Sequence, residues 1–216
     1  MKSSIKSVLL LLLIFGITSC KDKILGPNSD NLFYPLKVGN VWEYNIVQYD
    51  SIGNIEYEGD FQEKVIADTI INGKMLYEIE SPWYIDPACC DYHFYYHNSN
   101  DGLYFLIYSA VTTIRNNHIY KYPCSEGESF SLNNIHNDSL LVVSTNDTIT
   151  CEAGIFKCIV YKGIIKDVTT PATQIVGYVY TYISPGTGKI KLETFSINSN
   201  QEIIKRISYT LKSYSL

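Results

Sequence analysis

Hydrophobic and polar residues alternate with a period of two along most of the chain after residue 31. In the first such stretch, which begins near Val41, Trp42, Tyr44 and Ile46 share one face and Glu43 lies on the other. This alternation is typical of a strand that buries one face. No stretch has a 3.6-residue pattern over more than two turns, so the pattern predicts an all-β protein.

Turn residues separate the predicted strands at short intervals. Asn72-Gly73 stands between apolar runs and fits the positive φ angles of a type I′ hairpin. Pro185-Gly186 and residues 198–200 mark further turns near the C-terminal end. About a dozen short strands joined in this way predict an antiparallel meander, curved into a half-barrel or a sandwich.

Three strands have patterns that predict where their side chains lie. Ser139–Thr145 and Ile155–Ile165 are apolar on both faces, so we expect them in the middle of the sheet. The strand Glu202–Leu211 alternates instead. In it, the residues expected to face the core are Ile203, Ile207, Tyr209 and Leu211.

The N-terminal end of the chain has a different pattern. Val8–Cys20 is an apolar run that follows Lys2 and Lys6, ends in small residues and stops abruptly at Lys21. This is the organisation of a secretory signal, and the run is shorter than the roughly 20 apolar residues that span a bilayer. We therefore expect residues 32–216 to form a single β domain.

Residues 17–20 (ITSC) resemble the lipobox of bacterial lipoproteins. The resemblance implies that residues 1–19 are a lipoprotein signal peptide, that Cys20 is acylated, and that residues 20–31 form a lipidated flexible tether. The membrane is then a partner through the N-terminal lipid. Lys21 after the cysteine is compatible with an outer-membrane lipoprotein of the cell envelope, and leaves the periplasmic or surface face open.

Two further motifs resemble those of a broad set of uncharacterised bacterial lipoproteins. They are residues 35–44 (PLKVGNVWEY) and residues 182–188 (YISPGTG), followed by Lys189 where a hydrophobic residue is usual. Folds of this kind resemble the curved half-barrels of periplasmic lipoprotein carriers, which hold acyl chains in a hydrophobic concavity. The resemblance implies a binding protein for an apolar or amphiphilic ligand.

The composition limits the classes of ligand that the protein is expected to bind. The chain has 216 residues with 17 basic and 22 acidic side chains, a net charge of −5, which argues against nucleic acid. Its 19 tyrosines far outnumber the eight phenylalanines and two tryptophans. Packing within the sheet is the simpler interpretation, and a stacking surface for a glycan is the alternative. The candidate ligand contacts are Trp42, Tyr44, Trp83, Tyr178, Tyr180 and Tyr182.

Five cysteines besides the one in the lipobox would lie in an oxidising compartment. Cys151 and Cys158 flank a turn and could form a disulfide across a hairpin. Cys124 could pair with Cys89 or Cys90. Because five is odd, at least one thiol is left over.

Four triplets of the form Asp-Ser/Thr-aliphatic resemble an O-glycosylation motif of exported proteins. The candidate acceptors are Ser51, Thr69, Ser139 and Thr148.

No catalytic motif is present, because the chain has neither a Gly-x-Ser-x-Gly elbow nor a His-Glu-x-x-His pair. We expect no catalytic residue, no cofactor and no metal. The leading hypothesis is a non-catalytic lipoprotein that binds an apolar or amphiphilic ligand in a sheet concavity. The alternatives are a glycan-binding or scaffold subunit of a cell-surface complex, and a hydrolase of unknown type.

Overall fold

A computed structural model describes residues 33–82, 92–109, 112–132, 139–167 and 174–216. The chain divides into two units, Met1–Asn31 and Leu32–Leu216, and the fold described below is that of the second unit. Within the described ranges there is no α-helix, and no helix long and apolar enough to cross a membrane.

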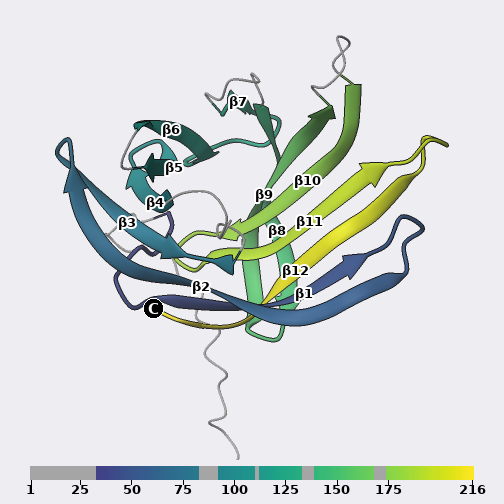
Figure 1. Cartoon of the computed structure of the whole chain (residues 1–216), viewed down its shortest axis with the longest axis horizontal. Coiled ribbons are helices and arrows are strands. Elements are labelled where there is room, and N and C mark those ends of the chain that lie inside the picture. The colour runs from purple at the N-terminus through teal and green to yellow at the C-terminus, as the bar shows by residue number, and fades with distance from the viewer. Residues whose placement is uncertain (1–32, 83–91, 110–111, 133–138, 168–173) are drawn as a thin grey trace, which may run out of the picture. The chain divides into compact units, whose positions relative to one another are not determined.

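The described residues form twelve strands. They are β1 (Val41–Tyr49), β2 (Ile55–Ile71), β3 (Lys74–Glu80), β4 (Tyr92–Ser99), β5 (Gly102–Ser109), β6 (Thr112–Lys121), β7 (Ser129–Ser131), β8 (Ser139–Cys151), β9 (Gly154–Asp167), β10 (Gln174–Ser184), β11 (Gly188–Ile197) and β12 (Ile203–Ser215). All belong to one antiparallel sheet in the order β6-β5-β4-β3-β2-β1-β12-β11-β10-β9-β8-β7 (Figure 1). The first and last strands pair in its middle, and β6 and β7, consecutive in the chain, are its edges.

The predicted all-β meander is confirmed. A single sheet that curves on itself corresponds to the half-barrel alternative and not to a sandwich of two sheets (Figure 1). The Asn72-Gly73 hairpin is confirmed as well, with φ angles of 52° and 76° at its two central residues. The position expected for β8 is wrong: it lies next to the edge strand β7, and Leu141 on its outer face is 38% exposed.

The sheet curls until its two edges approach each other, so that it is nearly closed. In place of a ladder between β6 and β7, side chains join the two ends. The Tyr161 hydroxyl on β9 donates a hydrogen bond of 2.7 Å to the Lys121 carbonyl at the end of β6. The Tyr161 ring lies 5.0 Å from that of Tyr120 and 6.1 Å from that of Phe130 on β7. These aromatic contacts close the interior where backbone pairing stops.

Two β-bulges reverse the side-chain alternation of strands in the C-terminal half. In β11, Tyr182 and Ile183 of β10 pair with Lys191 and Lys189, so Ile190 is the extra residue and Lys189 turns inward. In β12 the register shifts in the same way at Arg206. The bulge reverses the faces of the residues that precede it in β12. Ile203, which alternation places in the core, is therefore 61% exposed on the outer face.

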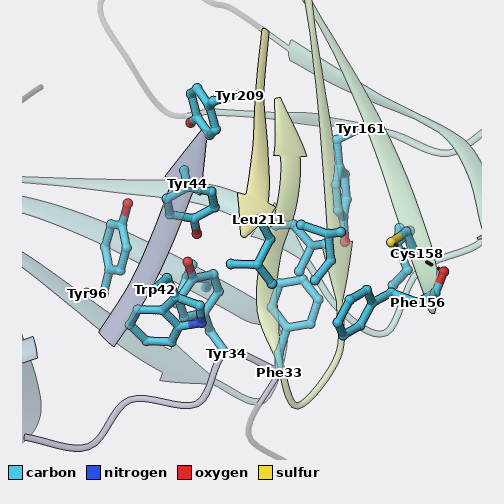
Figure 2. Packing of buried hydrophobic residues seen from close by; sticks show 14 of the residues in the cluster. Phe33, Tyr34, Trp42, Tyr44, Tyr96, Phe156, Cys158, Tyr161, Tyr209 and Leu211 are labelled. Carbon is cyan, nitrogen blue, oxygen red and sulfur yellow. Dashed lines mark hydrogen bonds between the residues drawn. The ribbon is translucent and has the colours of Figure 1, made fainter. Parts of the chain in front are cut away.

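The two motifs that resemble those of bacterial lipoproteins pack against each other inside the sheet, and Figure 2 shows Trp42 and Tyr44 of the first motif among the buried rings. The Trp42 indole donates a hydrogen bond of 2.6 Å to the Thr187 carbonyl, and the Tyr44 hydroxyl donates one of 3.1 Å to the Lys189 carbonyl. Trp42 and Tyr44 are 1% and 0% exposed. These two rings therefore belong to the core, and a contact between them and a ligand stays a prediction.

Substitution of two glycines in the β10–β11 turn can test how closely these two motifs pack. Both Gly186 and Gly188 have positive φ angles, of 80° and 103°. A Cβ at residue 188 would lie 3.0 Å from the Tyr34 ring and 3.1 Å from Trp42 Nε1, whereas a Cβ at residue 186 would meet nothing within 4 Å.

We expect Gly186→Ala to lower the free energy of unfolding by about 1 kcal/mol, the cost of the left-handed backbone alone. Gly188→Ala should cost about 2–4 kcal/mol, because the methyl group also overlaps buried rings. Urea unfolding followed by tryptophan fluorescence measures both. Equal losses for the two variants would contradict the close packing described here.

Candidate functional site

A groove of about 330 Å³ lies on the outer face of β9, β10, β11 and β12. Its lining residues are Lys162, Tyr178, Tyr180, Tyr182, Glu193, Phe195 and Ile203. The groove thus contains three of the six aromatic residues that the sequence nominates for ligand contact. It is open to solvent and lies on the face of the sheet that is turned away from the core.

Alternation along β10 places the three tyrosines in one column. Thr181 and Ile183 point inward and are buried, so Tyr178, Tyr180 and Tyr182 point outward. The antiparallel register then selects their neighbours. Across the sheet, Tyr178 faces Phe195, Tyr180 lies between Lys162 and Glu193, and Tyr182 faces Lys191.

Glu193 is the acidic group of the groove, and two lysines hold it. Its Oε1 lies 3.1 Å from Lys191 Nζ and 2.5 Å from Lys205 Nζ. Burial by itself raises the pKa of this carboxyl, but the ion pairs with Lys205 and Lys191 outweigh burial and leave the pKa below its usual value. The Tyr182 hydroxyl donates to Glu193 Oε2 at 3.4 Å. Burial and this neighbouring charge raise the pKa of Tyr182 to about 12.

Lys162 approaches the tyrosine column from β9, on the side opposite Glu193. Its Nζ lies 4.2 Å from the centroid of the Tyr178 ring and 5.5 Å from that of Tyr180. On the opposite side, the Phe195 ring meets the Tyr180 ring edge to face at 5.8 Å. The groove therefore combines flat aromatic surfaces with cations and one carboxylate at their edges.

A second unusual cluster lies in the interior of the sheet. Lys189 Nζ and Glu63 Oε1 form an ion pair of 2.8 Å, with side chains only 6% and 3% exposed. The ammonium lies 5.2 Å from the Tyr209 ring centroid and 5.8 Å from that of Tyr44. Burial by itself lowers the pKa of Lys189, but Glu63 and then Tyr209 raise it by more, so the pKa lies well above its usual value and the group stays charged.

A cluster of large buried side chains also lies in the interior of the sheet. The core includes Phe33, Tyr34, Trp42, Tyr161 and Leu211, each at most 2% exposed, and Figure 2 shows them meeting inside the sheet. In the described residues, the concave side of the sheet is therefore filled by protein side chains. The groove described above lies on the outer face, away from these side chains.

The other predicted site residues are scattered. Cys20, Trp83, Cys89 and Cys90 lie outside the described residues. The four glycosylation candidates remain predictions: Ser51, Ser139 and Thr148 are exposed, and Thr69 is half-buried.

The three cysteines that the structure describes are free thiols. The register of the β8–β9 hairpin places Cys151 opposite Gly154 and Cys158 opposite Asp147. The two cysteines thus lie several residues apart along the ladder, and the expected Cys151–Cys158 disulfide is absent. Cys124 is also free and lies 3.8 Å from the Tyr161 hydroxyl, so its expected disulfide is not formed either.

Three further residues of the groove are not among the sequence-based candidates. Lys162, Glu193 and Phe195 come from β9 and β11, and only the register of these strands against β10 brings them beside the tyrosines. The alternation of their own strands could have indicated that they face outward. It could not have indicated which tyrosine each one meets.

Comparison with protein-family models finds no match, and comparison with curated proteins finds none either. Among solved structures, a chain from Parabacteroides distasonis, provisionally described as a lipoprotein, is similar with a TM-score of 0.46 at 15% identity over 86% of this chain and 99% of that one. A chain from Bacteroides fragilis, provisionally described as an exported protein with a YmcC-like fold, gives a TM-score of 0.48 at 15% identity over 86% of this chain and all of that one, 100%. The function proposed below rests on the groove and not on these similarities.

The state of the thiols leads to a chemical prediction. Cys158 is fully buried, and burial, followed by Asp147, raises its pKa to about 12. Because only the thiolate reacts, iodoacetamide at pH 8 should leave Cys158 unmodified in the folded protein and label it in urea. Cys151, which is partly exposed, should be labelled in both states. Mass spectrometry without reductant measures this, and a Cys151–Cys158 disulfide would leave both residues unlabelled even in urea.

The interior ion pair leads to a second prediction. Lys189→Met leaves the Glu63 carboxylate buried without its counter-charge, so we expect the free energy of unfolding to fall by about 3–5 kcal/mol. The double variant with Glu63→Gln should recover most of that loss. Lys212→Met is the matched control, because Lys212 pairs with Asp60 at 2.6 Å on the surface. Removing that exposed pair should cost less than about 1 kcal/mol. Similar losses for Lys189→Met and Lys212→Met in urea unfolding would contradict the structural role of the buried pair.

Proposed function

We propose that this protein is a non-catalytic binding protein of the cell envelope that takes a saccharide in the groove of β9–β12. The observation that carries the proposal is the column of Tyr178, Tyr180 and Tyr182 on the solvent side of the sheet, with Glu193 beside it. A sugar ring has an apolar C–H face and a rim of hydroxyl groups. Tyrosine rings match the face, and charged side chains at the edge of the rings accept or donate hydrogen bonds to the hydroxyls.

The location in the envelope is supported by the N-terminal sequence. Residues 8–20 have the pattern of a secretory signal that ends in a lipobox-like cysteine. Acylation of Cys20 would attach the chain to the outer membrane without a spanning segment. A tether of residues 20–31 would then hold the β domain close to the lipid surface, where cell-envelope or environmental glycans are within reach.

A saccharide on the outer face has more support than an apolar ligand in the concavity. An acyl chain inside the sheet would have to displace packed rings such as Trp42 and Tyr44, and protein interiors have little free volume for that. In the outer groove, an acyl chain would cover Lys162 and Glu193 and remove their hydration without supplying hydrogen bonds. A hydroxyl-bearing ligand avoids both costs.

Binding without catalysis also agrees with the charge states in the groove. A general acid must carry a proton near neutral pH. The two lysine partners of Glu193 hold its pKa below the usual value, so the carboxyl is ionised. Tyr182, with a pKa of about 12, keeps its proton and serves as a hydrogen-bond donor.

A glycan array probed with the protein, followed by isothermal titration of the best ligand, tests the proposal. We expect Tyr180→Ala to weaken binding about tenfold, which corresponds to about 1.4 kcal/mol, because the central stacking surface is lost. Tyr57→Ala is the matched control, since Tyr57 is a half-exposed tyrosine on β2, outside the groove. Unchanged affinity in Tyr180→Ala, or no glycan binding by the unaltered protein, would refute the proposal, and the second result would favour the scaffold alternative.

A further inference from the structure

Lys162 is the lysine of the groove lining, and it has no carboxylate partner among the described residues. Lys191 and Lys205 both pair with Glu193, on the far side of the tyrosine column. The ammonium of Lys162 instead rests on the rings of Tyr178 and Tyr180. It is therefore a cation in an open groove, held by aromatic faces and not by an anion.

The carboxylate of the groove is already paired. Glu193 is the one acidic residue of the groove lining, and Lys191 and Lys205 both pair with it, whereas Lys162 lines the groove on the other side of the tyrosine column. The whole chain carries −5. An anionic ligand is thus disfavoured over most of the protein and favoured at this place, which gives the groove a preference that depends on charge.

We propose that the groove binds an acidic saccharide, with Lys162 binding the carboxylate of a uronic acid; this inference rests on the proposed function. When a carboxylate arrives, the ammonium exchanges its contact with the rings for a charge-assisted hydrogen bond. The same movement uncovers the faces of Tyr178 and Tyr180. One side-chain shift therefore creates both the ion pair and the stacking surface.

The register of the strands favours one orientation of the bound sugar. Lys162, Tyr180 and Glu193 occupy one row across β9, β10 and β11. Two strand spacings, about 10 Å, separate the first and last of them. A sugar ring stacked on Tyr180 can therefore turn its carboxylate toward Lys162 and its hydroxyls toward Glu193. The reverse orientation would bring two carboxylates together.

The test compares charged and neutral forms of the same sugars. The ligands are oligomers of galacturonic, glucuronic and mannuronic acid, each paired with its fully methyl-esterified form, which has the same backbone without the charge. The protein variants are the unaltered chain, Lys162→Met and Lys157→Met. Lys157 lies on the same strand as Lys162, is exposed outside the groove, and is bonded to Thr148 at 2.7 Å. Lys157→Met therefore removes the same charge from the same strand but leaves the groove intact.

We expect at least one acidic oligomer to bind about tenfold or more tightly than its ester, the factor that a hydrogen bond between charged groups contributes. That preference should vanish in Lys162→Met, persist in Lys157→Met and shrink at high salt. If the esters bind the unaltered protein as tightly as the acids, or if Lys162→Met keeps the preference, the acidic-sugar inference fails while the saccharide proposal stands. If neither these oligomers nor any neutral glycan of the array binds, both fail together.

Discussion

The buried ion pair between Lys189 and Glu63 is the constraint on which the rest of the structure depends. A charge that leaves water for a core must meet its partner at close range, or the fold loses several kcal/mol. The two residues lie 126 positions apart, one on β2 and one on β11. Their contact spans the β1–β12 pair that joins the two halves of the meander. The register of the middle of the sheet is thus coupled to a charge-pairing requirement as well as to hydrophobic burial.

That requirement explains several local features together. The bulge at Ile190 is needed because regular alternation would turn Lys189 outward, beside Lys191. The tight turn before it lets the Thr187 carbonyl meet the Trp42 indole. The rings of Tyr44 and Tyr209 then surround the ammonium and supply polarisable faces in place of water. The two sequence motifs recognised at opposite ends of the chain are therefore the two sides of one packed contact.

Local patterns predicted the parts of the fold that local physics determines. The strand at Val41–Tyr49 and the Asn72-Gly73 hairpin follow from a period of two and from turn chemistry, and both are present. The bulges at Ile190 and Arg206 are determined by partners on neighbouring strands, so alternation alone put Ile203 on the wrong face. For a similar reason, the apolar residues on both faces of β8 predict a central strand, because an exposed apolar face has the same sequence pattern as a covered one.

In the candidate site, too, features that depend on one strand can be predicted from sequence, and features that depend on neighbouring strands cannot. The column of Tyr178, Tyr180 and Tyr182 could be predicted, because it needs only alternation along one strand. The inference about charge could not, since it depends on Lys162 and Glu193 reaching Tyr180 from opposite neighbouring strands. The inward residues of β10 pack in the core, and this packing positions the strand whose outward tyrosines line the groove. Core and groove are therefore two faces of the same strands, and the packing that fills the interior also positions the surface on which we propose that a ligand binds.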